Sequence, residues 1–195
     1  MRAEFTALSV ACVLTCVATA ASGQTPEGEQ AAPATASSAN PMTDSTKRIY
    51  DATKQLVLRS LEKMPEDQLG FKPVDTVRSY GQIVGHIADA NYMICGMAAG
   101  EMSKPPDFEK TATTRADLTK ALNDAFAHCD KIYGDMTDAK GSEMLPKTPF
   151  GEQARLSMLA FNNMHTWEHY GNLITYMRIK GIVPPSSEQQ PGGEQ

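Results

Sequence analysis

The sequence predicts an all-α protein, a four-helix bundle whose helices are joined by long connections. Apolar residues recur at helical spacing in four separate stretches, and the chain shows neither a convincing alternating strand pattern nor an internal repeat. Four amphipathic helices without a sheet bury their apolar faces against one another. The chain has 195 residues, of which 41% are hydrophobic, and this composition suits one domain with a real core.

The first two helices are delimited by recognisable start and stop residues. The first is expected over residues 44–64, because Pro65 stops it. The second is expected over residues 80–99, where Ser79 and Gln82 have the spacing of a capping box at its start. A glycine directly after this helix is a good terminator.

The last two helices carry similar signals. The third is expected over residues 115–133, with Thr114 and Asp117 as its capping box. The fourth is expected over residues 152–180 and ends at Gly181, which two prolines follow soon after. At about 1.5 Å per residue, this fourth helix would span roughly 43 Å.

The connections between the helices leave the topology open. They cover about residues 65–78, 101–113 and 134–150, so all three are long. A chain of about 13 residues at roughly 3.3 Å each can cross the whole length of a bundle. Helices adjacent in the sequence therefore need not be antiparallel.

The N-terminus resembles a secretory signal peptide over residues 1–23. Arg2 supplies the positive start, an apolar stretch follows over residues 7–21, and small residues precede Ala21 and Gly23, where a signal peptidase would cut. The stretch is short for a membrane span, which needs about 20 apolar residues. We expect a periplasmic or secreted protein without stable membrane insertion after cleavage; the alternative is an uncleaved N-terminal anchor.

Two further segments have the composition of disordered chain. Residues 24–42 contain no aromatic residue and no Leu, Ile or Val, and residues 184–195 are similarly poor in apolar side chains. Such segments cannot bury enough surface to offset the entropy of ordering them. We therefore expect a linker over 24–42, a folded domain over 43–183 and a disordered tail over 184–195.

Charge and cysteine content exclude several classes of protein. A net charge of −5 and scattered basic residues argue against a nucleic-acid partner, which requires a basic face. None of the four cysteines lies in a C-x-x-C pair, which argues against zinc ribbons and thioredoxin-like sites. Signal cleavage would leave only Cys95 and Cys129, either as a disulfide or as two buried thiols.

Three of the four histidines form a candidate metal site. His165 and His169 are four residues apart on the fourth helix, so their rings lie about 40° apart, one turn apart in height, and can bind one ion from a single face. His86 falls on the apolar face of the second helix and is the natural third ligand. We expect one divalent metal per chain, zinc, nickel or a similar ion; the alternative is three buried structural histidines.

The residues around this triad suggest a site for a small molecule. Glu168 is the candidate catalytic residue, either orienting a ligand or accepting a proton from water, although it could instead be a surface residue paired with a cation. The candidate substrate-binding residues lie on the same two helical faces as the histidines: Asn162, Asn172, Tyr176 and Met93.

Three other interpretations of these residues are rejected. The pattern H-x-x-E-H at His165–His169 is that of an inverted zinc protease, but too little chain follows it to supply the further ligand and framework. Cys95 lies half a turn from His86 and cannot share a metal with it. His128 has no partner at helical spacing and is expected to be a surface or structural residue.

The chain resembles the DinB-like (DinB/YfiT-like) superfamily of helical metalloenzymes over about residues 43–183. The matching motifs are Gly85-His86-Ile87-Ala88-Asp89-Ala90 and His165-Thr166-Trp167-Glu168-His169-Tyr170-Gly171-Asn172. This resemblance implies a four-helix bundle in which His86, His165 and His169 hold one divalent metal, and frequent homodimers. It also implies kinship with thiol-dependent S-transferases and a maleylpyruvate isomerase.

The sequence therefore predicts an exported metal-dependent hydrolase or group (thiol) transferase acting on a small molecule. A bound divalent metal would lower the pKa of water or of a thiol. One alternative is a non-catalytic periplasmic bundle that binds a metal or a ligand. Another is a b-type haem bundle with His and Met axial ligands, since the chain has 11 Met.

Overall fold

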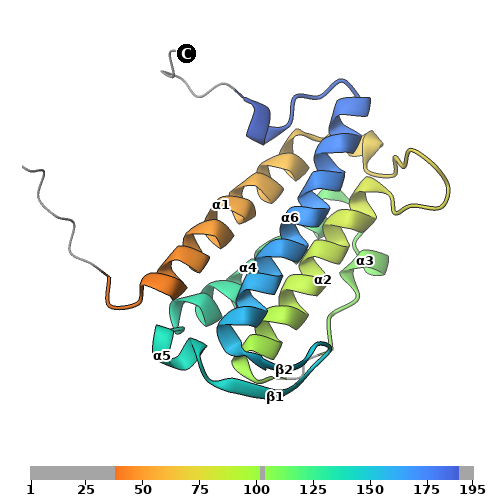
Figure 1. Cartoon of the computed structure of the whole chain (residues 1–195). Helices are drawn as coiled ribbons and strands as arrows, with labels where there is room; N and C mark the ends of the chain where they lie inside the picture. The colour runs from red at the N-terminus through yellow and green to blue at the C-terminus, as the bar shows by residue number, and fades with distance from the viewer. Residues whose placement is uncertain (1–37, 102–103, 189–195) are drawn as a thin grey trace, which may run out of the picture. The chain divides into compact units, whose positions relative to one another are not determined.

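The computed structural model describes residues 38–101 and 104–188, so the predicted signal peptide and most of the predicted linker lie outside the described residues. The fold class is confirmed: the described chain is mostly helical, with one small two-stranded sheet (Figure 1). Its elements in chain order are α1 (Pro41–Lys63), α2 (Tyr80–Ala99), α3 (Phe108–Thr111), α4 (Arg115–Gly134), α5 (Asp138–Gly141), β1 (Met144–Thr148), β2 (Gly151–Ala154) and α6 (Arg155–Ile179), with short 3-10 turns at Glu66–Gln68 and Pro185–Ser187.

The predicted boundaries of α2 and α4 are confirmed to within one residue. Ser79 and Thr114 each accept a backbone N–H three residues on, and both capping boxes form. The helix α1 begins earlier than predicted, at Pro41, because proline lacks the N–H that the first helical position leaves unpaired.

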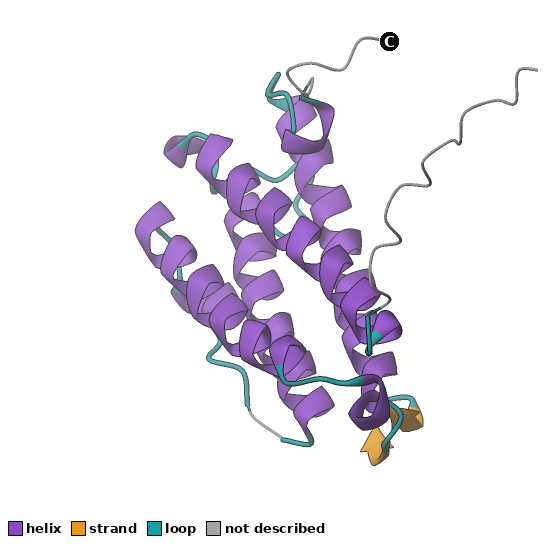
Figure 2. Cartoon of the chain, turned by 90° about the vertical axis from the view of Figure 1, so that its left-hand side faces the viewer, coloured by secondary structure: helices purple, strands orange, loops and turns teal. Residues whose placement is uncertain are grey.

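The hairpin before α6 is a correction to the sequence analysis, which expected no strand. Strands β1 and β2 pair antiparallel with Met144 opposite Ala154 and Leu145 opposite Gln153, so α6 begins at Arg155 instead of residue 152. The strands have five and four residues and only Leu145 is buried, so their apolar pattern is too short to predict them. Figure 2 shows the two strands, in orange, at one end of the helical bundle.

Two arginines at helix starts fix the directions of the long helices. Arg115, the first residue of α4, donates to the carbonyls of Leu61 and Met64 at the end of α1. Arg155, the first residue of α6, donates to the carbonyl of Ala98 at the end of α2, with a separation of 2.9 Å. The guanidinium groups thus satisfy carbonyls that a helix end leaves unpaired. It follows that α1 is antiparallel to α4, and α2 to α6.

Helices α2 and α4, by contrast, run parallel. Gly81 lies close to Leu118 near the start of both helices, and a disulfide joins Cys95 to Cys129 towards the end of both. The chain from α2 to α4 therefore crosses the length of the bundle and carries α3 on the way. This arrangement settles the topology and the state of the two cysteines, both of which the sequence left open.

One hydrophobic core fills the space between α1, α2, α4 and α6. Its largest fully buried side chains are Tyr80, Tyr170, Phe126, Leu61, Met64, Ile87, Ile94, Leu118, Leu122, Met158, Leu159 and Leu173. Among the described residues, no helix is both long enough and apolar enough to span a bilayer.

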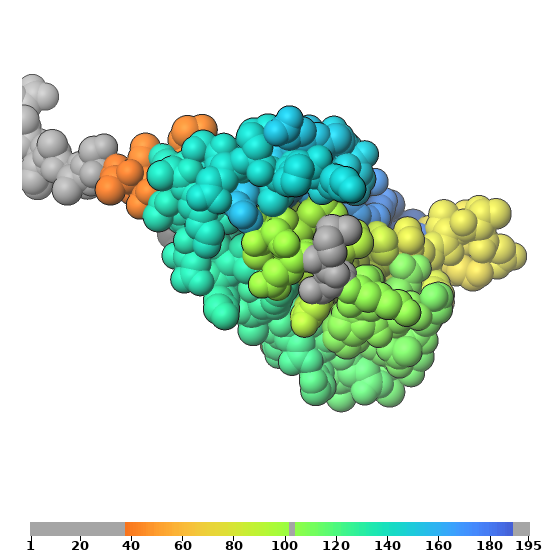
Figure 3. Space-filling model, turned by 90° about the horizontal axis from the view of Figure 1, so that it is seen from below, coloured from red at the N-terminus to blue at the C-terminus, as the bar shows by residue number. Residues whose placement is uncertain are grey.

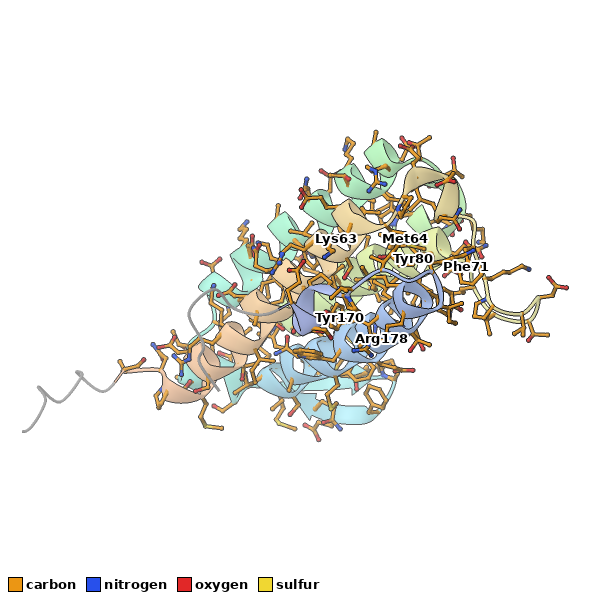
Figure 4. All side chains as sticks on the ribbon, turned by 90° about the horizontal axis from the view of Figure 1, so that it is seen from above. Lys63, Met64, Phe71, Tyr80, Tyr170 and Arg178 are labelled. Atoms are coloured by element: carbon orange, nitrogen blue, oxygen red, sulfur yellow. A yellow bond between two sulfur atoms is a disulfide. The ribbon has the colours of Figure 1, made fainter. Side chains whose placement is uncertain are left out.

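The C-terminal segment packs against the bundle up to Glu188, five residues past residue 183, where the folded domain was expected to end. Pro185 is buried, and the backbone N–H of Ser186 donates to the hydroxyl of Tyr170. Glu188 forms ion pairs with Arg59 and Lys63 of α1. Figure 4 views this end of the bundle, where the labelled Tyr170 lies beside the segment. The segment therefore links α6 to α1.

Candidate metal centre

The three predicted histidines meet between α2 and α6, which lie side by side (Figure 1). One ring nitrogen from each of His86, His165 and His169 lies within 4.8 Å of the other two. The ring centroids are 5.2 Å apart for His86 and His165, and 4.6 Å apart for His86 and His169. Because α2 and α6 are antiparallel and packed together, the single histidine of α2 faces the pair on α6.

The geometry of the histidine pair fits a metal ion. The two Nε2 atoms of His165 and His169 are 3.3 Å apart. Two nitrogens bound to one tetrahedral zinc ion at about 2.0–2.1 Å lie roughly 3.3 Å apart. On the opposite edges of the rings, His86 Nδ1 contacts a carboxylate and His169 Nδ1 lies 3.5 Å from the Asn172 amide, whereas His165 Nδ1 is buried without a partner among the described residues. The residues therefore fit a divalent cation held by three imidazoles.

Glu109 on α3 is a site residue that sequence reasoning missed. Its Oε2 is 3.0 Å from His86 Nδ1, so the imidazole N–H donates to the carboxylate and the lone pair of Nε2 faces the other histidines. A carboxylate in this position orients a metal-binding histidine and makes it a stronger ligand.

Two residues of α2 within one turn of His86, Gly85 and Asp89, hold α3 in place. A Cβ at Gly85 would lie 2.7 Å from the carbonyl oxygen of Phe108, so only glycine lets the backbone of α3 come this close. The carboxylate of Asp89 accepts the backbone N–H groups of Phe108 and Glu109, both at 2.9 Å. The motif around His86 thus encodes the place of Glu109 as well as of the histidine.

Arg78 extends this chain of contacts towards solvent. Its Nε donates to Glu109 Oε1 at 2.8 Å, and its backbone carbonyl accepts the hydroxyl of Tyr176 at 3.0 Å. Partial burial by itself raises the pKa of the Glu109 carboxyl. The hydrogen bond and charge of Arg78, together with His86, outweigh this effect and hold that pKa below its usual value. Glu109 is therefore ionised at neutral pH.

His165 and His169 are neutral at pH 7. Burial, with smaller contributions from His165, His86 and Arg78, lowers the pKa of His169 to about 4. Burial, together with His86, also lowers the pKa of His165. Metal ions bind the neutral form of imidazole, so the histidine pair of α6 needs little proton release before it binds a cation.

A cleft of about 580 Å³ opens beside the histidine cluster, of which His169 lines it. Four of the predicted site residues line it: Glu168, His169, Asn172 and Tyr176. The other lining residues are Thr76, Val77, Arg78, Gln82, Ile83 and Glu109. A volume of this size suits a small organic molecule.

Two predicted substrate-binding residues are placed elsewhere. Asn162 is 1% exposed and its Nδ2 donates to Asn91 Oδ1 at 2.9 Å, so it belongs to a polar network inside the core. Met93 lines a second, largely apolar hollow of about 560 Å³ near the hairpin. Figure 3 views this end of the molecule, where the hairpin lies near the segment that follows α2. Each residue was selected by its angle around its own helix, Asn162 on α6 and Met93 on α2, and such an angle carries no information on depth or on the partner helix.

His128 lies outside the centre, as predicted. Its ring stacks on Tyr92 with centroids 4.4 Å apart, and it is a structural residue of α4. No sequence signal pointed to Glu109 or Arg78, since neither lies on a long helix: Arg78 is in the connection from α1 to α2, and Glu109 is in the crossover from α2 to α4.

The fold and site together define a helical bundle in which three histidines on two antiparallel helices could hold a metal ion. The profile of the DinB superfamily matches residues 49–173, and the chain belongs to this superfamily. A search of curated proteins gives no match.

Solved structures share the fold. A DinB-like protein from Bacillus subtilis has a TM-score of 0.61 at 19% identity, covering 75% of this chain and 99% of that one. A DinB-like protein from Bacillus cereus ATCC 10987 has a TM-score of 0.54 at 17% identity, covering 73% and 95%. A mycothiol-dependent maleylpyruvate isomerase has a TM-score of 0.55 at 14% identity, covering 67% of this chain but only 60% of the isomerase.

Proposed function

We propose that this chain is an exported metal-dependent enzyme that hydrolyses a small organic molecule or transfers a group to or from it. The observation that carries the proposal is the cluster of three histidines beside a cleft large enough for such a molecule. When bound there, a divalent cation acts as a Lewis acid and lowers the pKa of a water or thiol ligand. A site of three protein ligands leaves a position open for such a ligand.

The residues of the site would have separate roles in metal binding, proton transfer and substrate binding. His86, His165 and His169 hold the cation, while Glu109 orients His86 by accepting the hydrogen of its Nδ1. Glu168 lines the cleft next to these groups and is the residue we assign to proton transfer. Tyr176, whose hydroxyl is bonded to the backbone of Arg78, forms a fixed wall of the cleft.

The site suits two classes of reaction, hydrolysis and thiol transfer. Hydrolysis needs only water in the cleft. Thiol transfer is supported by the similarity of fold to a mycothiol-dependent maleylpyruvate isomerase.

The direct test is a screen of turnover on ester, amide and thiol-transfer substrates with the zinc-loaded protein. We expect one class to be turned over, and Glu168→Gln to reduce the rate by about 10²-fold or more while leaving metal content unchanged. The matched control is Glu152→Gln, which changes an exposed glutamate of the hairpin. Full metal occupancy with no turnover across the panel would contradict catalysis and favour a metal-binding role.

Export is part of the proposal and has its own support. The disulfide between Cys95 and Cys129 is of a kind that persists in oxidising compartments. Expression of the full chain in a bacterium, followed by fractionation and N-terminal sequencing, tests it. We expect periplasmic protein beginning at Ser22 or Gln24, after one of the two small-residue sites. Cytosolic protein that retains Met1 would contradict export.

A further inference from the structure

Among the described residues that line the cleft, Arg78 is the only one with a permanent positive charge. Its Nε is bonded to Glu109, and its backbone is fixed by Tyr176. No hydrogen bond within the described residues engages its two terminal amino groups, and the side chain is 43% exposed. The end of the guanidinium is thus held in a defined place with its outer edge open to the cleft.

This outer edge has a definite chemical preference. Two parallel N–H groups match the two oxygens of a carboxylate, an arrangement that gives geometric specificity as well as binding energy. Because Glu109 fixes the Nε side of the group, less side-chain freedom is lost when a ligand binds the outer edge.

The charges around the cleft favour an anion once the metal is bound. The charged side chains that line the cleft are two carboxylates, Glu109 and Glu168, and one cation, Arg78. A divalent cation added to this set gives an excess of one positive charge. Arg78 is also near enough to the histidines for its charge to disfavour their protonated forms.

We propose that Arg78 is the binding site for a carboxylate group of the substrate, so that the enzyme acts on small organic acids. The inference rests on the proposed function, because it assumes that the reacting part of the molecule faces the histidines. The carboxylate end would lie at Arg78, on the side of Thr76 and Val77, and the rest of the molecule would extend towards His169.

The competing explanation is that Arg78 only supports Glu109. These two roles can be separated with Arg78→Gln, because glutamine retains an N–H donor for Glu109 but loses the charge and the paired N–H groups. Arg78→Lys is the second variant, since it retains the charge and loses the paired geometry. The matched control is Arg178→Gln, which changes an exposed arginine of α6 that bonds Ser187 outside the cleft.

The experiment measures binding of benzoate and of its neutral counterpart benzamide by calorimetry. Each protein is measured with and without bound zinc, and its metal content is determined. We expect the zinc-loaded wild type and Arg178→Gln to bind benzoate at least about tenfold more tightly than benzamide. Arg78→Gln should lose most of this preference with its metal content unchanged, and Arg78→Lys should fall between them.

The outcomes distinguish this inference from the proposed function. Equal binding of benzoate by the wild type and Arg78→Gln would overturn the role of Arg78, because a carboxylate bound to the metal alone does not need it. Loss of metal in Arg78→Gln, with the benzoate preference retained after zinc is restored, would overturn it in favour of support for Glu109. Absence of metal from the wild type would contradict the proposed function, and the comparison without zinc would still decide the role of Arg78.

Discussion

Replacement of Gly85 by alanine tests the link between the fold and the metal centre. A methyl group at this position would lie 2.7 Å from the carbonyl oxygen of Phe108 and 2.8 Å from the backbone nitrogen of Glu109. Since carbon and oxygen atoms in ordinary contact are about 3.4 Å apart or more, α3 must move outward by roughly 0.7 Å. Glu109 moves with it, and its 3.0 Å contact with His86 becomes too long for a good hydrogen bond.

The expected magnitude follows from two opposing effects. Overpacking of this kind costs about 1–3 kcal/mol. Alanine in place of glycine inside a helix stabilises the folded protein by about 1 kcal/mol, because alanine has the higher helix propensity. The net change is a loss of stability of about 1 kcal/mol, together with a fall in metal affinity of about tenfold from the weakened carboxylate contact.

The assay combines urea unfolding of the metal-free protein with a competition titration for zinc. Gly171→Ala is the matched control, because this glycine also lies within a helix but has no atom within 4 Å of a Cβ. It should stabilise the protein by up to about 1 kcal/mol and leave zinc affinity unchanged. If Gly85→Ala behaved like Gly171→Ala in both measurements, the proposed coupling between α3 and His86 would be refuted.

Three further predictions concern the site and its support. Glu109→Gln should weaken zinc binding by about 10- to 100-fold in a competition titration, because the carboxylate no longer orients His86. Reduction of the Cys95–Cys129 disulfide, which joins residues 34 apart, should lower the free energy of unfolding by about 3–4 kcal/mol in urea denaturation. In metal-free protein, acidification from about pH 6.5 to pH 4 should cost of order 2 kcal/mol through His169, because its pKa is about 4 when folded and about 6.5 when unfolded, so the unfolded chain binds more protons in this range.

Each of these predictions has a control and a contradicting result. Glu143→Gln, on a glutamate paired with Arg155, should not affect zinc binding; a Glu109→Gln variant with wild-type affinity would remove Glu109 from the site. A Cys95→Ala/Cys129→Ala variant should be insensitive to the reductant, and unchanged wild-type stability on reduction would contradict a role for the disulfide. His169→Gln should lose part of the acid sensitivity, and the same pH dependence in both proteins would contradict the pKa assigned to His169.

The sequence predicted the parts of the fold that depend on local signals. The capping boxes at Ser79 and Thr114 predicted where α2 and α4 begin, because they involve side chains and backbone within one turn. The three histidines were found because their helical spacing places them on core-facing stripes. These features require no knowledge of how distant segments meet.

The remaining features depend on tertiary structure. The parallel course of α2 and α4, and hence the position of Glu109 against His86, follows from a crossover whose path no local pattern fixes. Asn162 was assigned to the ligand site because its angle on α6 is right, yet α2 covers it through Asn91. The hairpin escaped prediction because its strands are too short and too exposed to show alternation.

The most direct test of the account is the metal content of the purified protein by mass spectrometry. We predict about one divalent metal ion per chain in the wild type and in His128→Ala, which changes the histidine outside the centre. The double variant His165→Ala/His169→Ala should contain none while retaining its helical spectrum. A wild-type protein that takes up no metal even when supplied with zinc or nickel would contradict the central claim, and would leave a helical bundle with three buried structural histidines.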